Sequence, residues 1–233
     1  MEHKMEWFSE EEGRITFYEE GKEWISFSVY VISGDEAEWK MNAPEIVDTI
    51  QKTGQIPDEI ISKVTKSLVE SFRLLWEEGF EETILVEQKG TEIWKILNST
   101  KVVKKSYSEY MMHRVFRSGE IVAHNSDNLI LTEEEDGFVC ENKEKSFFCR
   151  LLPYGSALET GRGFYVCEVE VAQEKRNRGT ATECLRELFC RLAEPGQVTI
   201  YLQVGSYNRP AVHLYEKLGF EVQEELCCYV TAE

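Results

Sequence analysis

A strand, a glycine-containing loop, a helix and a second strand follow one another in the C-terminal half, and this series constrains the fold most. Residues 164–171 alternate in polarity as a β-strand does. The loop 176–181 follows, and after it apolar residues recur at helical spacing until Pro195. A second strand pattern covers residues 199–203. This alternation of strands and helices predicts an α/β fold, in which helices cover a central sheet.

A weaker copy of the series lies earlier in the chain. Hairpin patterns at residues 15–27 and 138–148 match at a separation of 121 residues. A helix pattern follows Pro57, and a strand pattern covers residues 83–87. We therefore predict two similar halves that meet near residue 116, although two unrelated α/β halves could share this order by chance.

Net charge, apolar runs and the cysteine and histidine positions limit the partners, location and metal sites that we expect for this chain. The net charge of −17 disfavours nucleic acid and membrane surfaces as partners. It would favour the approach of a cationic molecule such as an amine, or it serves only to keep the protein soluble. The sequence contains neither a signal-like start nor an apolar run of about 20 residues, so we expect a cytoplasmic protein. The seven cysteines form no CxxC pair and the four histidines are scattered, which predicts reduced thiols and no metal site.

The loop 176–181 is suited to an anion. Unpaired N–H groups at the start of a helix point outward and attract phosphate. Gly179 has no side chain to block the approach, and Ala181 is small. Arg176 and Arg178 add positive charge to an otherwise acidic chain. Taken alone, the loop could equally be a plain turn that caps a core helix.

A second motif, about thirty residues later, points to a family. Asn208 and Ala211 precede the run Leu214-Tyr215-Glu216-Lys217-Leu218-Gly219-Phe220, and the loop reads Arg176-x-x-Gly179-x-Ala181. Over residues 127–233 the chain resembles the GCN5-related N-acetyltransferase (GNAT) superfamily. The resemblance implies the fold of acyl-CoA N-acyltransferases, a mixed central sheet flanked by helices, and acetyl-CoA as co-substrate.

The resemblance also implies roles for individual residues. The backbone of Val169 and Val171 would pair with the pantetheine arm, and Asn208 would hydrogen-bond it. Tyr215 would protonate the leaving thiolate, or is only a core aromatic residue of its helix. The pyrophosphate would be held by the loop residues Arg176, Asn177, Arg178, Gly179, Thr180 and Ala181.

The general base is not evident from the sequence. Positions where relatives carry a base hold Tyr165, Cys167 and Gln203, and none of these is an obvious proton acceptor at neutral pH. Glu168 and Glu170 interrupt a strand that we expect to be buried on both faces. Each is therefore a candidate base or acceptor-binding anion, or else the partner of a nearby arginine in an ion pair.

The first half lacks the features of the second. At the same separation, Gln55, Asp58 and Ile60 stand where the second half has Arg176, Gly179 and Ala181. An aspartate would repel phosphate and an isoleucine would crowd it. We predict a degenerate GNAT-like half, residues 1–116, that binds no coenzyme A, and an acetyl-CoA-binding domain, residues 117–233. The first half would form a wall of the acceptor pocket or an interface between the halves.

These features together predict an N-acetyltransferase that moves acetyl from acetyl-CoA to a primary amine by direct attack. The acceptor would be a cationic small molecule or, less favoured by the acidity, a peptide or protein amine. We expect no nucleic-acid or membrane partner, and a monomer or homodimer. The alternative is a catalytically inactive acyl-CoA-binding module that regulates a partner.

Overall fold

The computed structural model describes residues 2–120, 128–154, 162–194 and 196–231. By its internal contacts the chain divides into two compact units. Unit 1 comprises Met1–Ser108 and Glu225–Glu233, and unit 2 comprises Glu109–Glu224. The boundary that we predicted near residue 116 therefore falls inside a strand, and the C-terminal segment belongs to the first unit.

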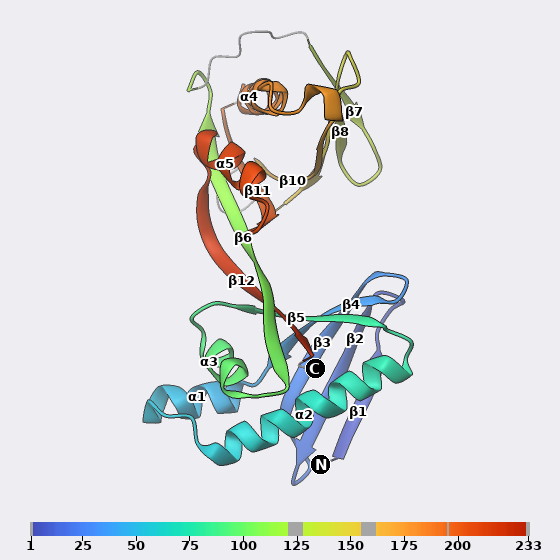
Figure 1. The fold of residues 1–233 in the computed structure, drawn as a ribbon, viewed down its shortest axis with the longest axis vertical. Helices are drawn as coiled ribbons and strands as arrows, with labels where there is room; N and C mark the ends of the chain where they lie inside the picture. Colours follow the sequence, from blue (N-terminus) through green and yellow to red (C-terminus); the bar gives the residue numbers. More distant parts are fainter. Residues whose placement is uncertain (1, 121–127, 155–161, 195, 232–233) are drawn as a thin grey trace. The chain divides into compact units, whose positions relative to one another are not determined.

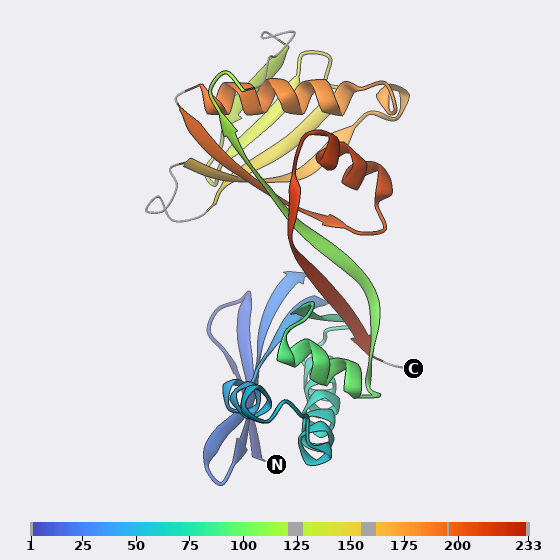
Figure 2. The same cartoon turned by 90° about the vertical axis from the view of Figure 1, so that its left-hand side faces the viewer.

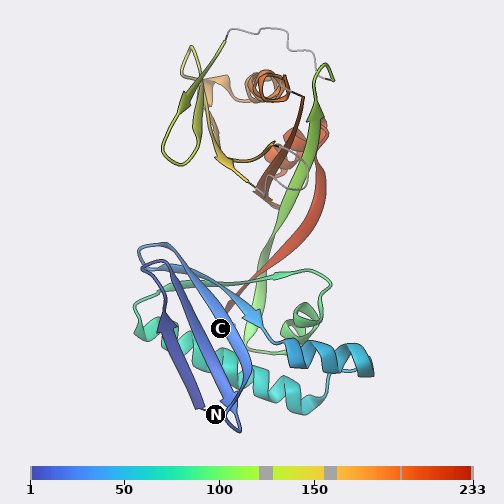
Figure 3. The same ribbon diagram turned by 180° about the vertical axis from the view of Figure 1, so that it is seen from behind.

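Unit 1 is a sheet with three helices. Its strands, in spatial order, are β1 (Glu2–Trp7), β2 (Glu12–Glu19), β3 (Lys22–Ser33), β4 (Glu36–Asn42), β5 (Glu82–Gln88) and the end of β12 (Glu221–Thr231). The helices are α1 (Pro44–Thr53), α2 (Asp58–Glu77) and α3 (Glu92–Ser99), and α2 lies across the strands (Figure 3). The predicted first hairpin, the helix after Pro57 and the strand at 83–87 are confirmed.

Unit 2 contains the sheet on which the candidate site is built (Figure 1). Its strands, in spatial order, are β6 (Val103–Arg117, from Glu109 onward), β11 (Gln197–Gly205), β10 (Arg162–Val171), β9 (Phe147–Pro153), β8 (Phe138–Asn142) and β7 (Leu129–Glu133). The helical segments are η1 (Gln173–Lys175), α4 (Thr180–Ala193) and α5 (Arg209–Lys217). Strands β10 and β11 run parallel, and the other neighbours described here are antiparallel.

The last strand of each unit comes from the other part of the chain. β6 follows α3 of unit 1, yet its residues 109–117 pair with β11 in unit 2. β12 follows α5 of unit 2, yet its residues 226–229 pair with β5 in unit 1. The order of elements and the sense of strand pairing are otherwise the same in both units.

One face of the unit 2 sheet is covered by helices. Val198, Ile200, Leu202 and Val204 on β11 share a buried core with residues of α4 and α5. Figure 2 shows α4 lying across the strands of this unit. Because strand side chains alternate, Tyr201 and Gln203 project from the opposite face. Burying the apolar half of β11 against the helices stabilises this unit.

The described residues bear on three further features: membrane-spanning helices, disulfide bonds and metal sites. None of their helices has the length and apolarity needed to cross a lipid bilayer; the cytoplasmic location stays a prediction. All seven cysteines are described, and none of them forms a disulfide bond. No group of three His, Cys, Asp or Glu side chains in the described ranges could hold a metal ion; His124 lies outside those ranges.

Candidate functional site

Strands β10 and β11 separate before either of them ends. Their parallel pairing runs from Arg162–Val198 to Val166–Leu202, whereas β10 continues to Val171 and β11 to Gly205. A β-bulge interrupts the pairing of β10 with β9 between Cys167 and Glu170. Glu168, inside the bulge, has a φ of 52°. Bulges bend a strand and increase its twist, so this one carries β10 away from β11 and opens a gap in the sheet.

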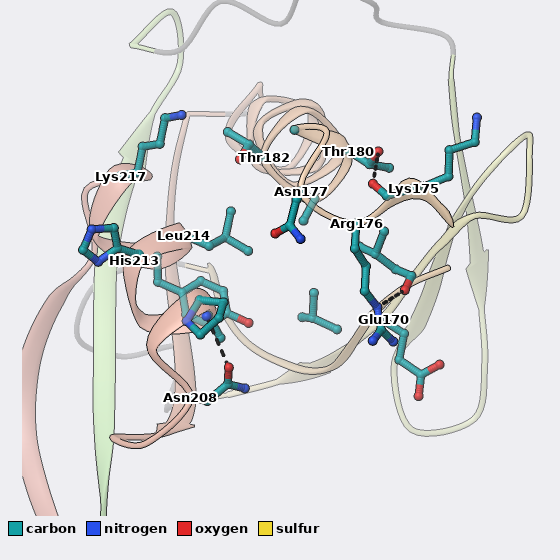
Figure 4. A pocket seen from close by; sticks show the side chains of 17 residues that line it. Glu170, Lys175, Arg176, Asn177, Thr180, Thr182, Asn208, His213, Leu214 and Lys217 are labelled. Carbon is teal, nitrogen blue, oxygen red and sulfur yellow. Dashed lines mark hydrogen bonds between the residues drawn. The ribbon is translucent and has the colours of Figure 1, made fainter. Parts of the chain in front are cut away.

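A cavity of about 780 Å³ lies at this gap and is shown in Figure 4. Its volume is typical of small-molecule and cofactor sites. The end of β10, the following loop, the first turn of α4 and the length of α5 form its walls. It is lined by Val169, Glu170, Val171, Lys175, Arg176, Asn177, Gly179, Thr180, Ala181, Thr182, Asn208, Pro210, Ala211, His213, Leu214, Tyr215 and Lys217.

The loop before α4 presents main-chain N–H groups to the cavity. Asn177 and Gly179 both have positive φ, 59° and 89°, and Gly179 is the N-cap of the helix. No side chain caps this helix start, so its first N–H groups remain available to an anion. A Cβ at Gly179 would meet no described atom closer than 3.8 Å, so the space beside it is open. Asn177 points into the cavity in Figure 4.

The Arg176 side chain fixes the loop to the strand. Its Nε donates a hydrogen bond to the carbonyl oxygen of Val171, at 2.9 Å. That carbonyl is therefore already engaged. The N–H of Val171 and the backbone of Val169 are left as the groups that could pair with an extended ligand.

Asn208 is the N-cap of α5. Its Oδ1 accepts a hydrogen bond from the N–H of Ala211 at 3.3 Å, and its own N–H donates to the carbonyl of Gly205 at 2.9 Å. These bonds fix the side chain at the edge of the cavity and leave Nδ2 as a donor toward a ligand. Asparagine is among the best residues at this helix position, so the cap also explains why α5 begins here.

The Tyr215 ring is buried and borders the cavity. It packs edge-on against Phe220, with ring centroids 5.9 Å apart. Burial, with smaller effects of Cys149 and Tyr165, raises the pKa of the phenol to about 12. The hydroxyl therefore stays protonated at neutral pH and can donate a hydrogen bond to a developing negative charge.

The structure brings most of the predicted site residues together and separates two of them. Arg178 and Glu168 do not line the cavity. The expectation of buried carboxylates on β10 was wrong: Glu170 is exposed, and the side chain of Glu168 is 55% exposed and lies 3.9 Å from Arg150. The reason is that β10 leaves its neighbour at the bulge, so its outer end is not buried on both faces. A catalytic role for either glutamate stays a prediction.

Several cavity residues were not predicted from the sequence. Lys175, His213 and Lys217 join Arg176 around the cavity, which gathers basic groups in a chain of net charge −17. Thr182 lies in the first turn of α4. In the sequence, only their position indicated that these residues line the site, because each lies within a few residues of one of the two motifs.

Comparisons with known proteins agree with this geometry. A family model described as the acetyltransferase (GNAT) family matches residues 90–220, more than half of the chain. A mycothiol acetyltransferase from Corynebacterium aurimucosum is 35% identical over 65 residues, which are 28% of this chain and 21% of that protein. The chain therefore matches about a fifth of that relative's length.

Solved structures show the same fold at low identity. A GCN5-related N-acetyltransferase from Sphaerobacter thermophilus superposes with a TM-score of 0.57 at 9% identity, over 96% of this chain and 81% of that one. A tandem GNAT protein from the clavulanic acid biosynthesis pathway gives 0.55 at 10% identity, over 95% and 83%. These likenesses confirm the predicted fold.

Proposed function

The chain belongs to the acetyltransferase (GNAT) family, and we propose that it transfers the acetyl group of acetyl-CoA to a primary amine by direct attack. The observation that carries this proposal is the cavity at the gap between β10 and β11. It combines two helix N-termini, four basic side chains and a buried phenol. The amides near Gly179 suit a diphosphate, the strand β10 suits an extended arm, and Tyr215 suits the leaving sulfur.

The chemistry requires no covalent enzyme intermediate. The nitrogen of the neutral amine attacks the thioester carbonyl carbon, and the C–S bond then breaks. The leaving thiolate receives a proton from the Tyr215 hydroxyl, and the phenol is reprotonated by the proton that the attacking nitrogen gives up. Because an alkylamine is protonated at neutral pH, one further proton must leave before attack.

We further propose that the chain is a tandem of two GNAT-like units, of which only unit 2 binds acetyl-CoA. The shared order of elements and the likeness to a tandem GNAT protein support the duplication. Asp58 at the start of α2 and Ile60 nearby would disfavour a diphosphate in unit 1. Calorimetric titration with CoASH is expected to give one site per chain; two sites would contradict this proposal.

The test of the proposed function is turnover. Purified protein is mixed with acetyl-CoA and a panel of amines, including butylamine and spermidine, and the release of free thiol is measured. We expect amine-dependent release. If CoASH binds but no amine accelerates thiol release, the protein is instead an acyl-CoA-binding module, the alternative favoured by the exposure of Glu168 and Glu170.

Substitution of Asn208 should separate its two roles. Asn208→Ser keeps an N-cap oxygen but removes the amide donor, so we expect CoASH to bind roughly 5-fold more weakly with little change in melting temperature. Asn208→Ala removes both functions and should also lower the free energy of unfolding by about 1 kcal/mol. Calorimetry and thermal melts measure these effects. Equal affinity of Asn208→Ser and wild type would contradict the ligand contact.

Glu183 places a negative charge in the first turn of α4, beside the proposed diphosphate site. We expect Glu183→Gln to tighten CoASH binding about 2- to 5-fold at low salt, because a charge near a helix N-terminus is worth about 0.3–1 kcal/mol. The gain should shrink at high ionic strength. Glu174→Gln, an exposed carboxylate of η1, is the control, and an equal gain there would show an effect of net charge alone.

A further inference from the structure

A carboxylate lies on the sheet face opposite α4, at the end where β10 and β11 separate. Glu109 on β6 is the partner of Gly205 in the pairing with β11, and its Oε2 accepts a hydrogen bond from Nε2 of Gln203. The residue is half-buried, and among the described residues it forms no ion pair with a basic side chain. Most acidic side chains of this protein are exposed, so a half-buried carboxylate without a cation needs a reason.

Glu109 is close to the proposed acetyl-CoA cavity. Gly205, its partner on β11, accepts a hydrogen bond from the N–H of Asn208, which lines the cavity. The pairing of β10 with β11 ends at Leu202, one residue before Gln203. The carboxylate therefore borders the gap that joins the two faces of the sheet.

Aromatic rings flank this carboxylate. An ideal Cβ at Gly205 would lie 2.6 Å from the Tyr207 ring, so that ring occupies the position where a residue 205 side chain would lie, on the face shared with Glu109. Tyr207 is 71% exposed, which leaves much of its surface open to a ligand. Tyr165 approaches from β10: burial, then the charges of Cys167 and Glu109, raise the pKa of its phenol to about 12. A carboxylate beside aromatic faces suits an ammonium ion.

Two further polar groups on this face lack a partner. In the described part of unit 2, the buried side-chain atoms without a hydrogen bond are Nδ1 of His113 and Oγ1 of Thr199. By strand alternation both lie on the face of Glu109 and Gln203. Buried polar atoms are normally satisfied by protein, water or ligand, so this face is prepared for polar occupants.

We propose that this face binds the acceptor, a small cationic alkylamine, and that Glu109 holds its ammonium group and removes the proton that must leave before attack. This inference rests on the proposed function. One N–H proton passes to the carboxylate, and the freed lone pair attacks the thioester carbon across the gap. The C–S bond breaks, the thiolate takes its proton from Tyr215, and the second proton that the nitrogen loses restores the phenol, so the protons balance. An acceptor with its own carboxylate beside the amine would be repelled.

The position on the strand distinguishes Glu109 from the other titratable groups of this face. His113 lies four residues along β6, about 13 Å away, where β10 and β11 are still paired. Phenols and thiols are uncharged at neutral pH, so they do not accept a proton readily. The titratable groups that share the face by strand alternation are His113, Arg117, Glu141, Arg150, Tyr154, Tyr165, Cys167, Tyr201 and Tyr207. Arg150 lies on β9, three strands from Glu109, and its guanidinium is already bonded to Glu134.

The test uses steady-state kinetics of the full chain with saturating acetyl-CoA and butylamine. Glu109→Gln is expected to lower kcat/KM for butylamine by about 100-fold or more and to leave the Kd for CoASH unchanged. The defect should shrink with trifluoroethylamine, whose ammonium loses its proton far more readily. β-Alanine, which carries a carboxylate, should be at least roughly 10-fold poorer than butylamine for wild type, from the Coulomb repulsion by Glu109.

Three variants make the result specific. Glu221→Gln, an exposed carboxylate of unit 2, should retain wild-type turnover. Gln203→Met leaves Glu109 in place but removes the hydrogen bond that orients its carboxylate, so kcat/KM for butylamine should fall roughly 10-fold while the Kd for CoASH stays unchanged. This variant tests the proposal even if Glu109→Gln does not fold. His113→Gln tests the competing base.

The outcomes separate this inference from the proposed function. Wild type that binds CoASH but acetylates no amine contradicts both. Wild type that acetylates butylamine while Glu109→Gln does so equally well contradicts only the role of Glu109. An unchanged kcat/KM for butylamine in Gln203→Met contradicts it too, as does loss of turnover in His113→Gln with retention in Glu109→Gln.

Discussion

Replacing Gly179 by glutamate is expected to weaken CoASH binding by about 100-fold. The new carboxylate would lie beside the N–H groups that we propose hold the diphosphate. Two like charges about 5 Å apart in a site of effective dielectric constant near 20 repel by about 3 kcal/mol. Isothermal titration calorimetry with CoASH measures the loss directly. Unimpaired binding by a folded Gly179→Glu protein would remove the foundation of the proposed function.

The control for this variant is another glycine with the same backbone. Gly90, in the turn between β5 and α3, has a φ of 95° against 89° for Gly179, and a Cβ there would meet nothing within 4 Å. Gly90→Glu therefore introduces similar backbone strain and the same charge, away from the cavity-lining residues. It should bind CoASH like wild type. Gly179→Ala adds strain without charge and should lose much less affinity than Gly179→Glu.

The elements of the site were predictable because each depends on local sequence. The apolar stripes that define α2 and α4 are regular over several turns, and the strands that flank α4 carry clear alternation. The loop at Gly179 and the motif that contains Tyr215 were assigned to one site through their resemblance to the GNAT family, and both line the cavity.

The strand exchange was not predictable from the sequence. A strand's pattern indicates which of its faces is buried, but not which neighbour it pairs with. β6 was assigned to the first half because it follows α3, and its pairing with β11 became visible only in the structure. Glu109 was missed for this reason: it meets Gln203 across 94 residues of sequence. The candidates for a base that the sequence suggested lie on β10 and β11, whereas Glu109 lies on β6.

The burial of β10 was misjudged for a related reason. A strand inside a mixed sheet is expected to be covered on both faces, which made Glu168 and Glu170 look like functional carboxylates. The bulge between Cys167 and Glu170 was not encoded by a glycine or proline, so no local signal predicted it. Once β10 leaves β11, its outer residues reach solvent and Glu168 needs no partner beyond Arg150.

Replacing Tyr215 by phenylalanine is expected to lower kcat by about 100- to 1,000-fold and to leave the Kd for CoASH unchanged. The variant keeps the ring that packs against Phe220 and removes only the hydroxyl, which we propose donates the proton to the thiolate. Thiol release with saturating butylamine measures kcat, and calorimetry measures the Kd. Tyr110→Phe removes a hydroxyl from a partly buried ring packed on the same core and should retain activity.

The raised pKa of Tyr215 fixes the expected pH dependence. A phenol must be protonated to act as the acid, and with a pKa of about 12 it remains so above the value of about 10 for an ordinary tyrosine. Deprotonation of Tyr215 should therefore cause no fall in wild-type kcat below pH 10. Any fall in that range has another cause and should also occur in Tyr215→Phe. The folded state holds this proton more tightly than the unfolded state, so the associated stability is fully present below about pH 10 and is lost as pH rises through about 12. If Tyr215→Phe turns over like wild type, the ring is only a core residue and the thiolate takes its proton from water.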